Sequence, residues 1–178
     1  MSHLNVELKA RCADLARARG ILEEAGADLR GTDLQRDVYF RVPAGRLKLR
    51  RGTIERSLIF YQRADEAGVK PSRVTLATLP PELGPALEDA LGAALGVANV
   101  VEKTREIRFL GNVKFHLDEV PGLGAFVEIE AIESPDVYTE EALREQCETW
   151  RTRLGIAPSD LVSHSYTDLV STSPGRHP

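Results

Sequence analysis

Residues 5–11 read Asn5-Val6-Glu7-Leu8-Lys9-Ala10-Arg11, with polar side chains at the odd positions and apolar ones at the even positions. Residues 112–118 and 125–132 follow a similar alternation. Successive side chains of an extended strand point to opposite faces of a sheet, so this period of two predicts strands with one charged face and one apolar face. A sheet built from such strands needs cover on its apolar face.

Further alternating segments predict strands at 35–42, 46–50, 58–63, 73–78 and 101–109. Amphipathic helices are predicted at 14–25, 81–95 and 140–154, each followed by a glycine as a stop signal, with Thr139 as the N-cap of the third. The apolar stripes of these helices suit the apolar face of the strands. The pattern therefore predicts one α+β domain over residues 1–170, followed by a disordered tail at 171–178.

The composition limits the class of partner. The 178 residues include 23 Lys and Arg against 27 Asp and Glu, for a formal net charge of −4. This mild acidity argues against a general binder of nucleic acid or of membranes. Cys12 and Cys147 lack the spacing of metal ligands, and no apolar run approaches the roughly 20 residues of a membrane span. With no signal peptide at the start, we expect a cytoplasmic protein.

Periodicity alone leaves two arrangements open. The sheet is either open, with its charged face in solvent, or closed, with the charged face lining a water-filled tunnel. The charges come as pairs two residues apart on one strand face, which places them about 7 Å apart and aims them at one ligand. These pairs are Glu7 with Lys9, Lys48 with Arg50, Lys103 with Arg105, and Glu128 with Glu130.

Several motifs follow one another in a specific order. They are Asn5-Val6-Glu7-Leu8-Lys9, Gln35 to Phe40, Gly45-Arg46-Leu47-Lys48-Leu49-Arg50, Leu58 to Arg63, Val101-Glu102-Lys103-Thr104-Arg105, His116 to Gly124, Phe126-Val127-Glu128-Ile129-Glu130, and Ser165-Tyr166. In this order they resemble the CYTH domains, also called triphosphate tunnel metalloenzymes, from Asn5 to Val170. That family includes class IV adenylyl cyclases, thiamine triphosphatases and inorganic triphosphatases. The resemblance implies a closed eight-stranded antiparallel β-barrel with a charged lumen, covered by about three amphipathic helices.

A triphosphate carries about four negative charges near neutral pH and needs several guanidinium and ammonium groups at once. The substrate-binding candidates are Lys9, Lys48, Arg50, Arg63, Lys103, Arg105 and Lys114. Arg108 is a weaker candidate, because the alternation turns it to the opposite face from Lys103 and Arg105. Following the resemblance, we expect Lys9, Arg63 and Asp118 to be catalytic.

Carboxylates in a site for anions indicate a cation between them and the phosphates, and Mg²⁺ or Mn²⁺ prefers such hard oxygen ligands. The metal candidates are Glu7, Asp118, Glu128 and Glu130. Asp37 ranks lower, with a salt bridge as its favoured role. Asn5 departs from the family, which has a carboxylate there, so we expect one firmly held metal. His116 shares a face with Asp118, and we expect it to form a hydrogen bond in the lumen wall.

Three functions remain open. The motifs favour a class IV adenylyl cyclase-like reaction, in which ATP gives cyclic AMP and pyrophosphate. The alternative is a triphosphatase that hydrolyses inorganic, thiamine or nucleoside triphosphate. The third is a polyphosphate- or nucleotide-binding module without turnover, which the departure at Asn5 motivates. In each case the partner is a small molecule that contains a triphosphate. The sequence leaves the oligomeric state open, with a homodimer as the common default for small enzymes.

Overall fold

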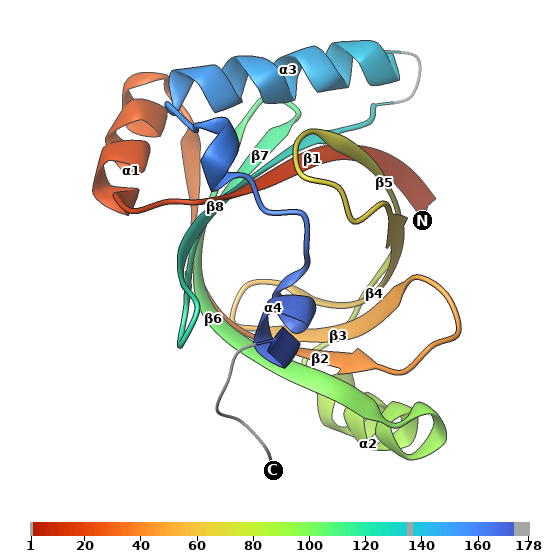
Figure 1. Ribbon diagram of the computed structural model, residues 1–178. Coiled ribbons are helices and arrows are strands. Elements are labelled where there is room, and N and C mark those ends of the chain that lie inside the picture. The colour runs from red at the N-terminus through yellow and green to blue at the C-terminus, as the bar shows by residue number, and fades with distance from the viewer. Residues whose placement is uncertain (1, 135–136, 173–178) are drawn as a thin grey trace.

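The computed structural model describes residues 2–134 and 137–172, in which eight strands form a single sheet (Figure 1). The strands are β1 (Ser2–Arg11), β2 (Asp28–Phe40), β3 (Arg46–Gly52), β4 (Arg56–Arg63), β5 (Lys70–Thr78), β6 (Val97–Leu110), β7 (Val113–Val120) and β8 (Gly124–Ile132). The helices of the described residues are α1 (Leu15–Glu24), α2 (Leu83–Leu95), α3 (Glu140–Arg153) and α4 (Tyr166–Thr172), with a short 3-10 turn at Pro158–Asp160.

The sheet closes into a barrel. Its strands lie in the order β1-β5-β4-β3-β2-β6-β7-β8, every neighbouring pair is antiparallel, and β8 pairs with β1. At that closure Glu7 lies opposite Glu130, and Lys9 lies opposite Glu128. Directly opposite residues of antiparallel strands share a face, so the charged positions of β1 and β8 point to one side. The predicted tunnel is confirmed, and the open sheet is excluded.

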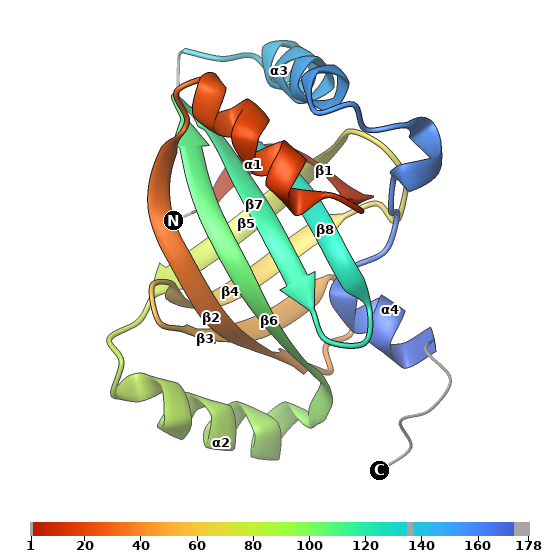
Figure 2. The same ribbon diagram turned by 90° about the vertical axis from the view of Figure 1, so that its left-hand side faces the viewer.

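Helices cover the outside of the barrel on two sides, as Figures 1 and 2 show. The helices α1 and α3 pack on β1, β7 and β8, where Leu8, Phe115 and Ile129 are fully buried against Leu143 and Trp150. The Phe115 and Trp150 rings meet edge to face with their centroids 4.8 Å apart. Burial of each such side chain contributes about 1.5–3 kcal/mol. These contacts orient the apolar faces outward and so leave the charged faces for the lumen.

The second layer of cover is α2, which lies against β2 and β3. Val38 and Leu49 on these strands are fully buried beneath Leu87 and Leu91 of the helix. The predicted N-cap of α3 is confirmed, since Thr139 Oγ1 accepts a hydrogen bond from Ala142 N at 3.2 Å. None of the helices in the described part of the chain is long and apolar enough to cross a membrane.

Several strands begin earlier than predicted, β2 by the most, and one helix was not predicted. The strand β2 begins at Asp28, seven residues before the predicted position 35, because it pairs with β6 across a bulge between Leu29 and Gly31 that interrupts the alternation. The helix α4 was not predicted, and it includes Ser171 and Thr172, which we assigned to the tail. The remaining tail residues, 173–178, lie outside the described residues.

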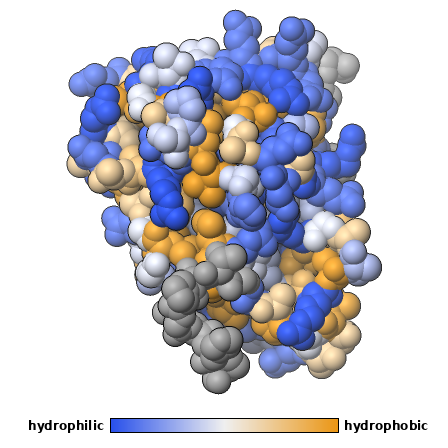
Figure 3. Space-filling model, in the orientation of Figure 1, coloured by the Kyte–Doolittle hydropathy of each residue, from blue (hydrophilic) through white to orange (hydrophobic). Residues whose placement is uncertain are grey.

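The helix α4 lies across one end of the barrel, opposite the end where the N-terminus lies (Figure 2). Arg46 of β3 links α4 to the β4–β5 loop. Its Nη2 donates to Asp168 Oδ2 of α4 at 2.9 Å and to Asp65 Oδ1 of the loop at 2.7 Å. Hydrophilic residues cover much of this face of the molecule (Figure 3). Hydrogen bonds therefore link segments from three parts of the chain at the α4 end of the barrel.

Candidate active site

The lumen contains a cavity of about 470 Å³. Its lining extends from His3 near the N-terminus to Tyr166 at the start of α4, so the cavity runs along the barrel. Six of the strands contribute charged side chains or histidines to it, whereas β2 contributes Tyr39 and β5 contributes only neutral side chains. Among the described residues, no helix residue before Tyr166 lines it. The site is thus built almost entirely from the inward face of the sheet.

All seven predicted substrate-binding cations line this cavity. They are Lys9 on β1, Lys48 and Arg50 on β3, Arg63 on β4, Lys103 and Arg105 on β6, and Lys114 on β7. Arg108 is turned to the outside, as the alternation indicated, and its guanidinium pairs with Glu106 and Glu23 at 2.6 Å each. Seven cations from five strands surround one volume, which is enough to neutralise a triphosphate.

Buried carboxylates hold these cations in place. Asp37, fully buried on β2, accepts from Arg50 Nε at 2.9 Å, from Lys48 at 3.1 Å and from Lys103 at 3.4 Å. Burial alone would raise the pKa of Asp37, but the charges of Arg50, Lys48 and Lys103 outweigh it and hold the pKa well below its usual value. Asp37 therefore acts as the ionised anchor of three cations, the role that the sequence favoured for it.

Asp118 lies directly opposite Arg105 and so on the inward face of the sheet, but it does not line the cavity. It is fully buried and accepts hydrogen bonds from Arg105 Nε at 2.6 Å and from the Tyr166 hydroxyl at 2.7 Å. Burial raises its pKa, but Arg105 and Lys103 outweigh that effect, so the pKa of Asp118 lies below its usual value. The structure thus places Asp118 as a partner of Arg105, whose guanidinium separates it from Glu128.

The best cluster for a metal ion joins Glu128 and Glu130 to His116. One ligand atom from each of the three residues lies within 4.8 Å of the others, with His116 Nδ1 3.2 Å from Glu128 Oε2 and 3.7 Å from Glu130 Oε1. His116 Nε2 is buried without a hydrogen-bond partner. Two carboxylates beside an imidazole suit Mn²⁺, and the carboxylate oxygens also suit Mg²⁺. The donor set therefore fits a divalent ion.

The protonation states support that fit. Burial raises the pKa of Glu128, but Lys9, 2.9 Å away, and Arg105 outweigh it and hold the pKa well below the usual value, so the group is ionised. Burial, together with the charge of Arg105, lowers the pKa of His116, which favours the neutral ring that a metal requires. Glu7 lines the same cavity but forms an ion pair with Arg63 instead of joining the cluster.

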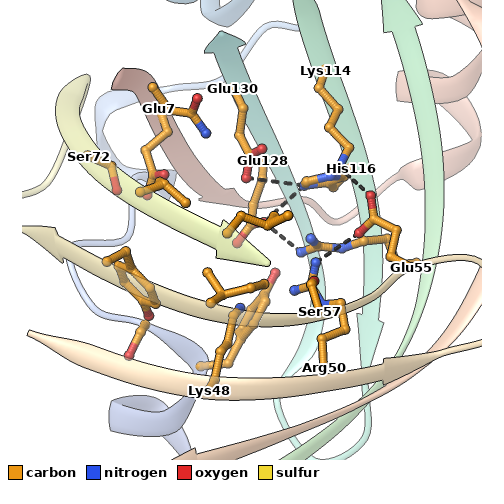
Figure 4. Close-up of a pocket in the computed structure, with 18 of the residues that line it drawn as sticks. Glu7, Lys48, Arg50, Glu55, Ser57, Ser72, Lys114, His116, Glu128 and Glu130 are labelled. Atoms are coloured by element: carbon orange, nitrogen blue, oxygen red, sulfur yellow. Dashed lines mark hydrogen bonds and ion pairs between the residues drawn. The ribbon is translucent and has the colours of Figure 1, made fainter. Parts of the chain in front are cut away.

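Glu55 is a lumen residue that sequence reasoning missed. It lies between β3 and β4, where no alternation marks it, and its carboxylate accepts from Arg50 Nη1 at 2.9 Å and from Lys114 Nζ at 2.5 Å (Figure 4). Asp33 holds this loop by accepting hydrogen bonds from Ile54 N at 2.7 Å and Glu55 N at 3.1 Å. Glu55 is thereby fixed beside two cations of the predicted phosphate site.

Tyrosine rings also pack against the cations. Lys9 Nζ lies 3.5 Å from the centroid of the Tyr166 ring, and Lys103 Nζ lies 4.9 Å from it. Lys48 Nζ lies 5.5 Å from the Tyr39 ring centroid and 5.7 Å from that of Tyr61. Such contacts stabilise an ammonium group without neutralising it. The tyrosine rings thus help to orient these lysines in the lumen.

A family model described as the CYTH domain matches residues 3–166 of this chain. Among solved structures, the PH1012 protein from Pyrococcus horikoshii is 28% identical, with 93% of this chain and 98% of that chain covered and a TM-score of 0.76. A proposed adenylate cyclase from Vibrio parahaemolyticus is 21% identical, with 97% and 100% covered and a TM-score of 0.75.

A proposed adenylyl cyclase from Hippeastrum, described as having a dominant triphosphatase activity, is 14% identical, with 92% of this chain and 91% of that chain covered and a TM-score of 0.59. At that identity, as for the Vibrio protein, the likeness concerns the fold. The search of curated proteins found no match.

Proposed function

Because this chain belongs to the CYTH domain family, we propose that it binds a triphosphate together with a divalent metal ion in the barrel lumen and cleaves it. The observation that carries the proposal is the meeting of the seven predicted cations and four carboxylates, Glu7, Glu55, Glu128 and Glu130, on one cavity of about 470 Å³. Cations alone would suit any anion. Carboxylates in the same cavity are favourable for a phosphate ligand only when a metal ion lies between them.

The residues divide into two proposed groups. The phosphates bind to Lys48, Arg50, Arg63, Lys103, Arg105 and Lys114, with Lys9 at the boundary. Glu128 and Glu130 hold Mg²⁺ or Mn²⁺ with His116 beside them, and Glu7 joins when Arg63 turns from it to a phosphate. A bound metal ion would supply charge neutralisation at the phosphate oxygens. We assign Asp118 to positioning, since it holds Arg105 and does not line the cavity.

For the reaction itself, we propose a class IV adenylyl cyclase-like step on ATP. The ribose 3′-hydroxyl loses its proton to water and its oxygen forms a bond to the α-phosphorus, while the bond from that phosphorus to the bridging oxygen breaks and pyrophosphate leaves. Negative charge grows on the leaving group, so the fixed cations of the lumen stabilise the transition state. Lys9 and Arg63 are the proposed catalytic cations, because they lie beside the carboxylates Glu128 and Glu7 at the boundary of the metal site.

Hydrolysis is the second candidate, and His116 favours it. Its ring lies 3.2 Å from Glu128, and its buried Nε2 has no hydrogen-bond partner. A neutral imidazole in this position accepts a proton from a water that attacks the terminal phosphorus. In this reaction the bond from the terminal phosphorus to the bridging oxygen breaks, the diphosphate part leaves, inorganic phosphate is formed, and no cyclic product forms.

One experiment separates the functions. The protein is incubated with ATP, thiamine triphosphate and tripolyphosphate, each with Mg²⁺ or Mn²⁺, and the products are resolved by chromatography. Cyclic AMP with pyrophosphate supports the cyclase, and phosphate release supports the hydrolase. Calorimetric binding without a product supports the module without turnover. If none of the three compounds binds, the proposed function is wrong.

A further inference from the structure

The lumen has a neutral wall as well as a charged one. On β4 and β5, Ile59, Tyr61 and Val74 form an inward-facing apolar cluster with Leu76, and all four line the cavity that the cations line. Ile132 of β8 lines the same cavity. An inorganic phosphate ligand has no apolar part to bury, so such a surface would contribute nothing to its binding.

Two polar side chains lie next to this cluster. Asn5 and Ser72 are directly opposite each other on β1 and β5, with exposed fractions of 6% and 1%. Asn5 Oδ1 and Ser72 Oγ are both buried without a hydrogen-bond partner, and both residues line the cavity. Buried polar atoms are nearly always paired in native proteins, so two adjacent unpaired ones point to a ligand that supplies the partner.

Two of the phosphate-binding candidates lie beside this wall, Lys48 on the neighbouring strand β3 and Arg63 on β4 itself. Lys48 is directly opposite Ile59, and Arg63 is directly opposite Ser72. Neighbouring strands are about 4.8 Å apart, so a group attached to phosphates on Lys48 and Arg63 reaches the neutral wall without a linker. Figure 4 shows Ser72 on one side of the pocket and Arg50 with Glu55 on the other.

We propose that Asn5, Ser72, Ile59, Val74 and Leu76 form a subsite for the organic group of an organic triphosphate. The group is a heterocycle with an amino substituent, whose ring packs on the three apolar side chains and whose N–H donates to Asn5 Oδ1. This inference rests on the proposed function and deepens it, because it excludes inorganic tripolyphosphate as the preferred substrate.

Asn5 fits this role better than that of a metal ligand. The clustered carboxylates Glu128 and Glu130 lie directly opposite Lys9 and Glu7, whereas the residue directly opposite Asn5 on β8 is Ile132. A neutral amide between a hydroxyl and an isoleucine attracts a divalent cation weakly, since such ions prefer several charged oxygens. The same surroundings suit a neutral N–H donor on an apolar ring.

The test measures binding of ATP, CTP, thiamine triphosphate and tripolyphosphate to the full chain by calorimetry in Mg²⁺. At least one of the three organic ligands should bind about tenfold more tightly than tripolyphosphate. Leu76→Ala should weaken binding of that ligand by about tenfold, and Asn5→Ala should weaken it by roughly two- to tenfold. Neither variant should change the affinity for tripolyphosphate. Thr75→Ala, on the exposed face of the same strand, is the matched control.

Three results would overturn the subsite. Equal affinity for the organic ligands and tripolyphosphate would do so, and so would equal weakening of all ligands by Leu76→Ala. An Asn5→Asp variant that strengthens binding of all four ligands equally would assign Asn5 to a cation instead. In each case tripolyphosphate still binds and the proposed function stands. Loss of all binding in the unaltered protein would reject both proposals.

Discussion

The carboxylate of Asp118 lies 2.6 Å from Nε of Arg105 and does not line the cavity. Tyr166 donates to the same carboxylate at 2.7 Å, and Arg105 Nη2 donates to Glu128 Oε2 at 2.6 Å. A continuous chain of hydrogen bonds therefore runs from α4 to the proposed metal site. Arg105, which lines the cavity, is held by a residue that does not.

Replacing Asp118 by Asn should destabilise the protein and misplace Arg105. Breaking a buried ion pair leaves an uncompensated charge, so we expect a loss of about 3 kcal/mol in the free energy of unfolding, measured in urea. Affinity for the triphosphate should fall as well. Tyr166→Phe removes one hydrogen bond only and should cost about 1 kcal/mol. An unchanged unfolding free energy in Asp118→Asn would contradict the positioning role.

Replacing Glu130 by Gln should abolish metal-dependent turnover and leave the fold intact. The amide keeps the shape of the side chain but removes a charge that the metal ion needs. Turnover across a Mn²⁺ titration and the thermal unfolding midpoint are the two measurements. Glu102→Gln on β6 is the control, because that side chain is 69% exposed and lies outside the cavity. Undiminished turnover in Glu130→Gln would remove Glu130 from the site.

Neighbouring arginines on β3 offer a comparison of the two sheet faces. Arg50 lines the cavity, whereas Arg51 points outward and pairs with Glu88 at 2.8 Å. Arg50→Ala should weaken triphosphate binding by about 10- to 100-fold, the value of one charge-assisted contact. Arg51→Ala should leave the affinity within about twofold. Equal effects in a calorimetric titration would contradict the assignment of Arg50 to the phosphate site.

Lys103 gives the binding a pH dependence. Burial and the charge of Arg105 lower the pKa of Lys103 to about 7, although Asp37 and Asp118 act in the opposite direction. The free protein therefore loses this positive charge as the pH rises through about 7, and triphosphate binding should weaken there. The ratio of affinities between the unaltered protein and Lys103→Met, measured from pH 6 to 9, should fall toward one. A ratio that stays constant over this range would contradict the assignment.

The lowered pKa of Lys103 also affects the free energy of unfolding. In the unfolded chain a lysine keeps its proton up to a pKa near 10.5, so between about pH 7 and 10.5 the unfolded state binds more protons than the folded one. The Lys103 contribution to the free energy of unfolding should therefore rise with pH across this window. Urea unfolding of Lys103→Met should show a smaller rise, and an identical slope would contradict it.

Gly52 is required where β3 turns toward β4. A Cβ at this position would lie 2.5 Å from the Glu55 carbonyl oxygen and 2.6 Å from the Asp33 carboxylate, the pair that fixes the loop. Gly52→Ala should therefore destabilise the protein by about 1–3 kcal/mol. Gly20→Ala in α1, where no atom lies within 4 Å, should stabilise it by up to about 1 kcal/mol. Urea unfolding of both variants checks the contrast, and equal effects would contradict it.

The alternation of the strands predicted much of the site because a period of two fixes which side chains share a face. The alternation predicted that Lys103 and Arg105 line the lumen and that Arg108 faces away from it, as the structure shows. Alternation cannot say how deep a side chain lies, so it grouped Asp118 with the metal candidates. The register of β6 with β7, which sets Asp118 directly opposite Arg105, is a long-range property that the local pattern does not contain.

Other parts of the site lacked any periodic signal. Glu55 lies in a loop that Asp33 holds from another strand, so only the folded contacts reveal its position. The apolar wall was not predicted, because Ile59 and Val74 are apolar residues at lumen positions, where the other strands carry charged residues. The helix α4 is a single short segment, and it packs through Tyr166 onto Phe126 with ring centroids 5.1 Å apart instead of showing a long apolar stripe.

The closure of β1 on β8 also sets the order of events during synthesis. Lys9 leaves the ribosome early, but its partner Glu128 and the Tyr166 ring are translated more than a hundred residues later. A nascent chain that has not yet reached Glu128 therefore carries Lys9 without this ion-pair partner. The wall on which the two side chains face each other forms only after β8 has been synthesised.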